Sequence, residues 1–209
     1  LFIQFSKFKI FNNKSWDISF DLKEFLLFLE KESNKFQIDF FKEKNEEYFI
    51  NTREEAFNLL KKKKRDVKVY AKKCLNLFQE KKIQSEDFKG SYFPNFLASL
   101  INDDNIYYNN SIENALKGST RLYNKSINDD KVKIIEQIRP ELLDNYNNIK
   151  KTVVDIKILN SLLLYLPILS IIPRVNQKIN KIQKADNLKL ISKFNYELNK
   201  LITSYDTPE

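Results

Sequence analysis

The sequence predicts an α+β protein dominated by helices, in which a small amino-terminal α+β unit with two hairpins precedes a carboxy-terminal helical bundle. Three observations predict this class. Apolar and polar residues alternate in short runs near the amino terminus, apolar residues recur at helical spacing further on, and the 209 residues include only two glycines. We predict three segments: an α+β unit over 1–51, a basic helix with a connecting region over 52–105, and the bundle over 106–209.

The amino-terminal segment contains two alternating patterns. Apolar residues alternate with polar ones in Leu1–Phe20 on both sides of a turn-like stretch, which predicts a hairpin. Asp21 is suited to cap a helix over 22–33. Alternation returns in Phe36–Phe40 and, after a charged turn, in Tyr48–Ile50, which predicts a second hairpin. The alternative is that some of these aromatic-rich runs are helical.

A long amphipathic helix is predicted to follow. Thr52 and Glu55 form a capping-box pattern, and the helix should run from there to about Glu80. One helical face is apolar, with Val67, Ala71, Cys74 and Phe78 at spacings of four, three and four. Another face is basic at the same spacings, with Lys61, Arg65, Lys68 and Lys72. A short helix ending near Asn102 and another beginning at Ser111 are expected next.

The remaining chain has strong helical periodicity. Asp129 or Asp130 can cap a helix that ends at Arg139, and Pro140 is expected in the first turn of the next one. Apolar residues then recur at spacings of four and three towards the apolar centre: Leu142, Tyr146, Ile149, Val153 and Ile156. A last helix is expected to begin at Asp186 or Asn187.

The bundle is predicted to be organised around Ile158–Pro173, which carries no charged side chain. This segment has 173 − 158 + 1 = 16 residues, fewer than the roughly 20 that a membrane-spanning helix needs. It is therefore predicted to be a buried core helix that kinks near Pro167 and stops at Pro173. A short or re-entrant membrane segment is the alternative.

Composition excludes several kinds of chemistry. The chain has no histidine, which rules out histidine-based triads and histidine-containing metal sites, and its two glycines cannot form a phosphate-binding loop. Cys74 is the single cysteine, so an intrachain disulfide is impossible. We therefore predict a protein that is not an enzyme and uses no cofactor or metal. An enzyme that works with carboxylates alone is the disfavoured alternative.

The sequence constrains the cellular compartment of the protein less strongly. A single cysteine favours a reducing intracellular or organellar compartment, although a secreted or exported helical protein also fits. The chain contains no methionine and starts at Leu1, so we expect the numbering to begin after a removed leader or tag, or at a non-standard start. Abundant Lys, Asn, Ile, Phe and Tyr are typical of an AT-rich genome.

The strongest functional candidate is the basic run Lys61–Lys73. It holds eight basic residues and one acid, Asp66, in a chain of net charge +8. A basic helical row gains affinity for phosphates by releasing counterions, and an aromatic ring can stack on an unpaired base. The candidate nucleic-acid-binding residues are Lys61, Lys62, Lys64, Arg65, Lys68, Tyr70, Lys72 and Lys73. A solvated helix face, a nuclear-import signal and a contact with anionic lipid are the other interpretations.

These observations favour a non-enzymatic binding protein. Its basic helix would contact an anionic partner, most naturally RNA within a ribonucleoprotein or ribosome-like assembly, with protein partners in the same complex. The alternative is a processed or exported helical protein that binds other proteins, or an accessory subunit of a large complex, and uses an apolar patch. Membrane contact is the least favoured of these roles.

Overall fold

A computed structural model describes the chain at residues 20, 23, 24, 27, 31, 35–102 and 106–186. These residues are 81% helical and 1% strand, and they contain no sheet. The strand content is one isolated antiparallel bridge between Phe88 and Tyr123. The predicted α+β fold class is therefore wrong, because the protein is helical, and the helical bundle within that prediction is confirmed.

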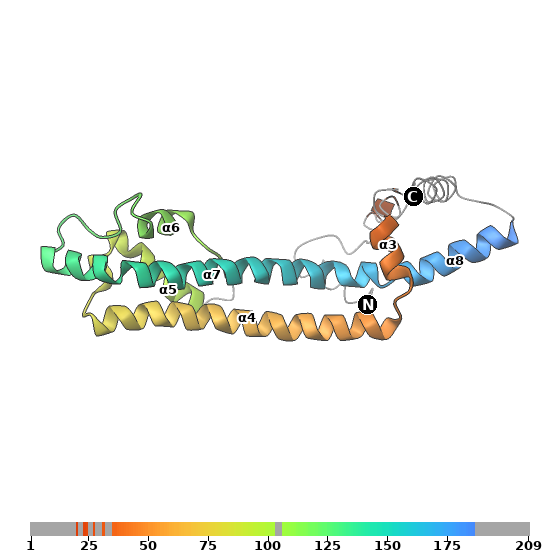
Figure 1. Cartoon of the computed structure of the whole chain (residues 1–209), viewed down its shortest axis with the longest axis horizontal. Helices are drawn as coiled ribbons and strands as arrows, with labels where there is room; N and C mark the ends of the chain where they lie inside the picture. The colour runs from red at the N-terminus through yellow and green to blue at the C-terminus, as the bar shows by residue number, and fades with distance from the viewer. Residues whose placement is uncertain are drawn as a thin grey trace, which may run out of the picture. The chain divides into compact units, whose positions relative to one another are not determined.

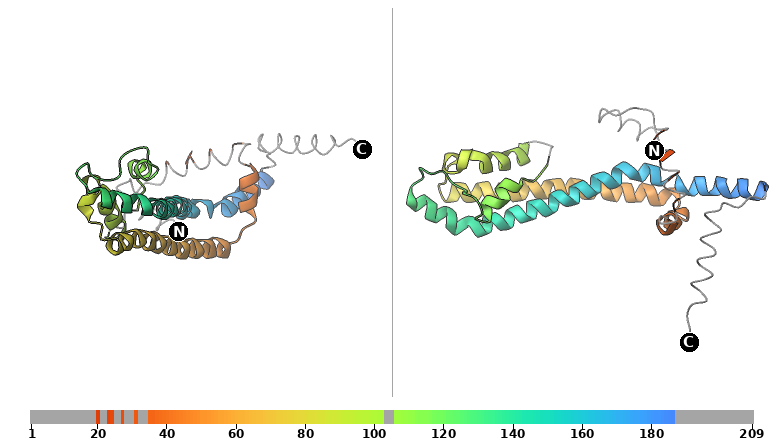
Figure 2. Two further views of the ribbon diagram at one scale, coloured as in Figure 1. Left: turned by 60° about the vertical axis from the view of Figure 1, so that its left-hand side comes forward. Right: turned by 90° about the horizontal axis from the view of Figure 1, so that it is seen from above.

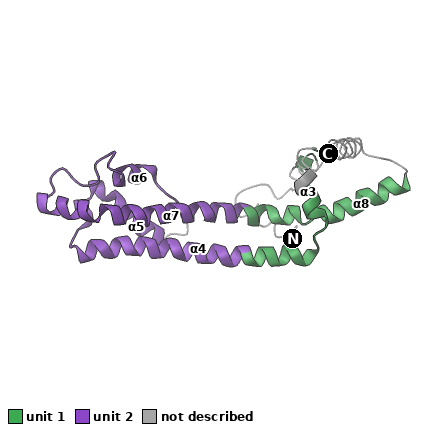
Figure 3. Ribbon diagram, in the orientation of Figure 1, with its two compact units in different colours: residues 1–55, 162–209 green, residues 56–161 purple. Residues whose placement is uncertain are grey.

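The described helices are, in chain order, α3 (Lys35–Lys42), α4 (Glu46–Glu80), α5 (Tyr92–Asn102), α6 (Asn110–Leu116), α7 (Asp129–Leu169) and α8 (Ile172–Ala185) (Figure 1). Two 3₁₀ turns, η2 (Ser85–Asp87) and η3 (Lys89–Ser91), connect α4 to α5. The chain divides into two compact units (Figure 3). Unit 1 comprises residues 1–55 and 162–209, and unit 2 comprises residues 56–161.

The predicted second hairpin is replaced by helices. Phe36–Phe40 lies within α3 and Tyr48–Ile50 lies in the first turns of α4. The side chain of Asn45 accepts a hydrogen bond of 2.9 Å from the backbone N–H of Tyr48, which caps α4 at its start. Runs of three to five residues are too short for alternation to distinguish strand from helix. The predicted first hairpin and the helix over 22–33 lie largely outside the described residues.

The predicted capping box is also wrong. α4 begins six residues before Thr52, whose hydroxyl donates a 2.7 Å hydrogen bond to the carbonyl of Tyr48 within the helix. The predicted end of this helix near Glu80 is correct.

The core of unit 2 lies along the seam between α4 and α7, which run side by side in Figures 1 and 2. The Lys63 ammonium of α4 lies 2.6 Å from the Asp155 carboxylate of α7. The apolar faces predicted for both helices are buried: Val67, Ala71, Cys74 and Phe78 of α4, and Leu142, Tyr146, Ile149, Val153 and Ile156 of α7. Burial of these two periodic rows is the main stabilising contribution in unit 2.

α5 and the turns before it complete this core. The rings of Phe78, Phe88 and Phe93 form a cluster with centroids 4.6 to 5.9 Å apart. Edge and tilted ring contacts of this kind add to the stabilisation from apolar burial. The cluster joins the end of α4 to η3 and α5.

Tyr146 fixes the segment before α6 to α7. Its hydroxyl donates a 2.5 Å hydrogen bond to the carbonyl of Asn109 and accepts one of 2.8 Å from the N–H of the same residue. The Asn109 side chain in turn accepts from the N–H of Ser111 and caps α6. Burial raises the pKa of Tyr146 to about 12, so the phenol stays protonated and keeps both hydrogen bonds.

α7 passes through Pro140 without a break, so the predicted helix boundary there is wrong. A proline inside a helix removes one backbone hydrogen bond and costs about 3 kcal/mol. Buried residues on both sides of it, Ile138 and Leu142, hold the helix in the core of unit 2. The free energy gained by burying these two residues outweighs the tendency of Pro140 to end the helix.

The apolar segment Ile158–Pro173 is only partly buried. Leu159 and Leu166 are buried, whereas Ile158 is 62% exposed and Tyr165 is 56% exposed. The helical region Asp129–Ala185 includes a window of mean hydropathy 1.8 that is long and apolar enough to cross a membrane, and 33% of that window is buried within the chain. Core helices of soluble proteins pass the same test.

The helix kink predicted near Pro167 and the helix end predicted at Pro173 both differ from the structure of unit 1. α7 ends at Leu169, two residues after Pro167, and Pro173 lies in the first turn of α8 instead of ending a helix. α3 packs against this junction through a small apolar cluster, in which Ile38, Ile168 and Ile172 are buried.

Glu113 of α6 is buried in unit 2. Its ion pairs provide a test of how α6 packs against α7. Its carboxylate lies 2.6 Å from the ammonium groups of Lys117 and of Lys150 on α7. The hydrogen bond from Lys117 and then that from Lys150 hold the pKa of Glu113 below its usual range.

We predict that Glu113→Gln lowers the free energy of unfolding at pH 7 by about 1–3 kcal/mol, because two ammonium groups lose a charged partner. The folded-state pKa is lowered, so the advantage of the wild type is complete above the ordinary glutamate pKa of 4.5 and disappears as the pH falls below it. Urea unfolding of both proteins from pH 7 to pH 3 measures this difference. The exposed Glu80→Gln variant serves as the control and should match the wild type at each pH. A constant difference for Glu113→Gln across this range would contradict the assignment.

Candidate nucleic-acid interface

The predicted basic residues lie on the long helix α4, within unit 2. At 100° per residue, Lys61, Arg65, Lys68 and Lys72 fall within about 60° of one another and extend over about 17 Å of helix. We call these four residues the basic row. Lys61, Arg65 and Lys72 are exposed and Lys68 is half-buried. The buried residues of α4 are centred about 120° around the helix from the row, so packing in the core leaves most of the row accessible.

The other predicted cations lie around the row. Lys64 is half-buried on one side of it, and Lys62 and Lys73 are exposed about 100° or more around the helix from Lys61. Four of the seven predicted cations therefore lie close together in the basic row. Lys64 lies beside the row, and Lys62 and Lys73 lie on the adjoining face of α4.

No cation of the basic row forms an ion pair with a carboxylate in the part of the chain that the structure describes. Lys63, in the middle of the same run, behaves differently. Its ammonium pairs with Asp155 in the seam between α4 and α7, and this hydrogen bond raises the pKa of Lys63. The run thus contains one cation that pairs across the seam, and the basic row has no such pair among the described residues.

Tyr70 does not lie with the basic row. It is half-buried and falls about 180° around the helix from Lys61, and the Lys73 ammonium lies 5.6 Å from its ring centroid. The aromatic ring beside the row is instead Phe57, which is 48% exposed and lies one turn before Lys61. The Lys61 ammonium lies 4.5 Å from the Phe57 centroid. The spacing of four between Phe57 and Lys61 is the sequence signal that identifies this pair.

α8 carries a second group of cations that the sequence interpretation did not select. Its fourteen residues include no acid and four cations: Arg174, Lys178, Lys181 and Lys184. Arg174 forms an exposed ion pair of 2.9 Å with Glu46. These residues belong to unit 1 and form a basic surface of their own.

Among the described residues, no group of three or more histidine, cysteine, aspartate or glutamate side chains is placed to hold a metal ion. Cys74 is buried between α4 and α7, and burial raises the pKa of its thiol to about 12. A thiol of this kind is a packing residue and a poor nucleophile.

Comparisons with protein-family models, with curated proteins and with solved structures find no match to this chain. The geometry and the charge of the candidate interface are therefore the basis for the function proposed below.

We predict that Cys74 resists thiol reagents in the folded protein, because its sulfur is buried and protonated at neutral pH. Modification by Ellman's reagent at pH 8 should be at least about a hundredfold slower than in urea-unfolded protein, since reaction requires opening of the core. A Cys74→Ala, Ser126→Cys double variant, which places a thiol at an exposed loop position, should react at once. Rapid reaction of native Cys74 would show that the seam between α4 and α7 is open.

Proposed function

We propose that the protein is a non-enzymatic binding protein that contacts RNA through the basic row of α4. One observation carries this proposal: four cations are aligned on one helix face, with no carboxylate partner among the described residues. Each phosphate that they neutralise releases a condensed counterion, which drives binding. Three of the four are lysines, which act as point charges and favour contact with the phosphate backbone over reading of base edges.

The exposed ring of Phe57 favours single-stranded RNA over a duplex. A base that is not paired can stack on an exposed aromatic ring, whereas a base inside a duplex is already stacked on its neighbours. The Lys61 ammonium beside Phe57 would neutralise a nearby phosphate. A segment of single strand could therefore place its backbone along the basic row and one base on Phe57.

The basic row is tested by replacing Lys61, Arg65, Lys68 and Lys72 with glutamine. Binding of a fluorescent single-stranded RNA at low salt should be lost or fall by at least about a hundredfold. The slope of log K against log salt should decrease by about 3, from roughly 0.7 per phosphate contact. Fluorescence anisotropy over a salt series measures both quantities.

A matched control replaces four other lysines of unit 2 with glutamine: Lys81, Lys125, Lys133 and Lys151. It removes the same charge and should keep both the affinity and most of the salt slope. Equal losses in the two variants would reduce the effect to net charge and contradict the proposal. Loss of binding that instead follows neutralisation of Lys178, Lys181 and Lys184 would move the interface to α8 and also contradict it.

The role of Phe57 has a separate test. Phe57→Leu should weaken binding of single-stranded RNA by about 1–3 kcal/mol, the range for one base stacked on an aromatic ring. Binding of duplex RNA should be unchanged, because the paired bases do not use the ring. Tyr70→Leu is the comparison, and it should leave both affinities unchanged. A larger effect of Tyr70→Leu would assign the stacking surface to the other side of α4.

A further inference from the structure

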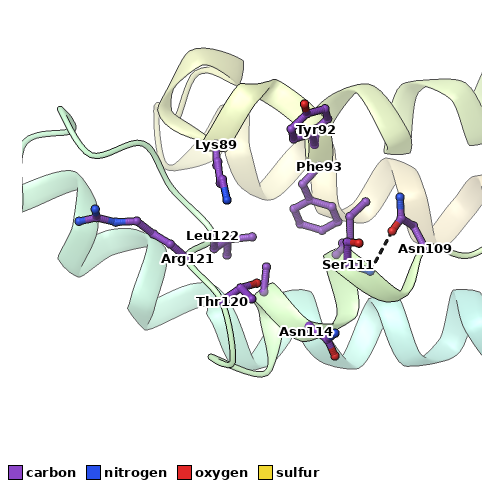
Figure 4. Close-up of a pocket in the computed structure, with 11 residues that line it drawn as sticks. Lys89, Tyr92, Phe93, Asn109, Ser111, Asn114, Thr120, Arg121 and Leu122 are labelled. Atoms are coloured by element: carbon purple, nitrogen blue, oxygen red, sulfur yellow. Dashed lines mark hydrogen bonds between the residues drawn. The ribbon is translucent and has the colours of Figure 1, made fainter.

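A cavity of about 440 Å³ lies in unit 2, away from the basic row, between η3, the start of α5, α6 and residues 120–122 (Figure 4). Its apolar lining includes Phe93, Ile112 and Leu122, all of them buried. Its polar lining includes Lys89, Ser111 and Thr120, which are exposed at the mouth. This volume lies within the range of small-molecule sites, and the lining combines an apolar wall with polar side chains that could orient a ligand.

The walls of the cavity are held by the backbone. Gly90 and Ser91 adopt left-handed conformations, with φ of 57° and 52°. A Cβ at Gly90 would lie 2.8 Å from the ring of Tyr92, so glycine lets this ring pack closely over the turn. The left-handed conformation costs little at Gly90 but is strained at Ser91, and such strain is often found at functional sites.

The opposite sides of the cavity are also fixed. The N–H of Lys89 donates a 3.1 Å hydrogen bond to the carbonyl of Leu122, which joins η3 to the segment before α7. Asn109, at the start of α6, is held by the buried Tyr146 of α7. The cavity is therefore formed before any ligand arrives, which reduces the entropic cost of binding.

The electrostatics of the cavity favour an anion. None of its lining residues is acidic, and Lys89 has no ion pair with any carboxylate that the structure describes. In Figure 4 the Lys89 ammonium points towards Leu122 and the interior, on the same side as the Thr120 side chain. The guanidinium of Arg121 points away, and lies 5.3 Å from the ring centroid of Tyr123. One inward cation with nearby hydroxyl groups suits a single negative charge.

We propose that this cavity binds a small organic monocarboxylate whose body is a single aromatic system or a short acyl chain. The carboxylate accepts hydrogen bonds from Lys89 and from the hydroxyls of Ser111 and Thr120, and the apolar body packs on Phe93, Ile112 and Leu122. This site uses no residue of the basic row, so it stands independently of RNA binding.

The probes are 2-naphthoate and its neutral amide, 2-naphthamide, titrated into the full chain by isothermal calorimetry. The two have the same ring system and differ in charge. We expect saturable binding of 2-naphthoate and binding of 2-naphthamide that is at least about tenfold weaker. Lys89→Gln should weaken 2-naphthoate by roughly ten- to a hundredfold, the range for a hydrogen bond to a charged group, and should not affect 2-naphthamide. Thr120→Val, which keeps the side-chain shape, should weaken 2-naphthoate severalfold.

Lys81→Gln removes an exposed lysine outside the cavity and should have no effect on either probe. Thermal unfolding of each variant shows whether it is folded, and the glutamine variant of the basic row should bind 2-naphthoate like the wild type. The proposal is overturned by equal binding of the two probes, by unchanged binding in Lys89→Gln, or by the absence of saturable 2-naphthoate binding at millimolar concentration.

Discussion

The structure of unit 2 depends on the apolar seam between α4 and α7. Each helix contributes an apolar row with spacings of three and four, and both rows are buried. Because the side chains of a helix project in all directions, burial of one face determines which residues are left for solvent. The same constraint places Cys74 in the interior and Lys61 outside. The candidate interface is therefore a consequence of core packing as much as of local charge.

The seam also gives neighbouring lysines different roles. Lys63 is close enough to Asp155 to pair with it across the two helices, whereas Lys61 and Arg65 have no carboxylate within reach among the described residues. A partly exposed pair contributes little to stability, but it orients α4 against α7. A row of cations without carboxylate partners produces a positive electrostatic potential at the surface of α4. In a chain with a large excess of lysine, this distinction is more informative than the total charge.

Polar contacts add to the stabilisation that apolar packing gives unit 2. Tyr146 satisfies both backbone groups of Asn109, and Glu113 is held by two lysines, one of them from α7. These groups are buried or nearly so, and buried polar groups without partners would be costly. They hold α6 and the segment before it against α7, and Asn109, Ser111 and Ile112 of this region line the cavity of unit 2.

The amino-acid sequence alone determined the long-range helical faces, because a row that recurs over seven or more residues at spacings of three and four has no other regular solution. It correctly predicted the buried face of α4 formed by Val67, Ala71, Cys74 and Phe78, and that of α7 from Leu142 to Ile156. Tertiary structure decided the rest. The short run Phe36–Phe40 is helical, and its Ile38 packs against Ile168 and Ile172. Pro140 was tolerated because Ile138 and Leu142 are buried on either side of it. Helical spacing alone places Phe57 beside Lys61 and Tyr70 on the other side of α4. The contact of Lys89 with Leu122, in contrast, joins segments that are far apart in the chain, and no local pattern contains that information.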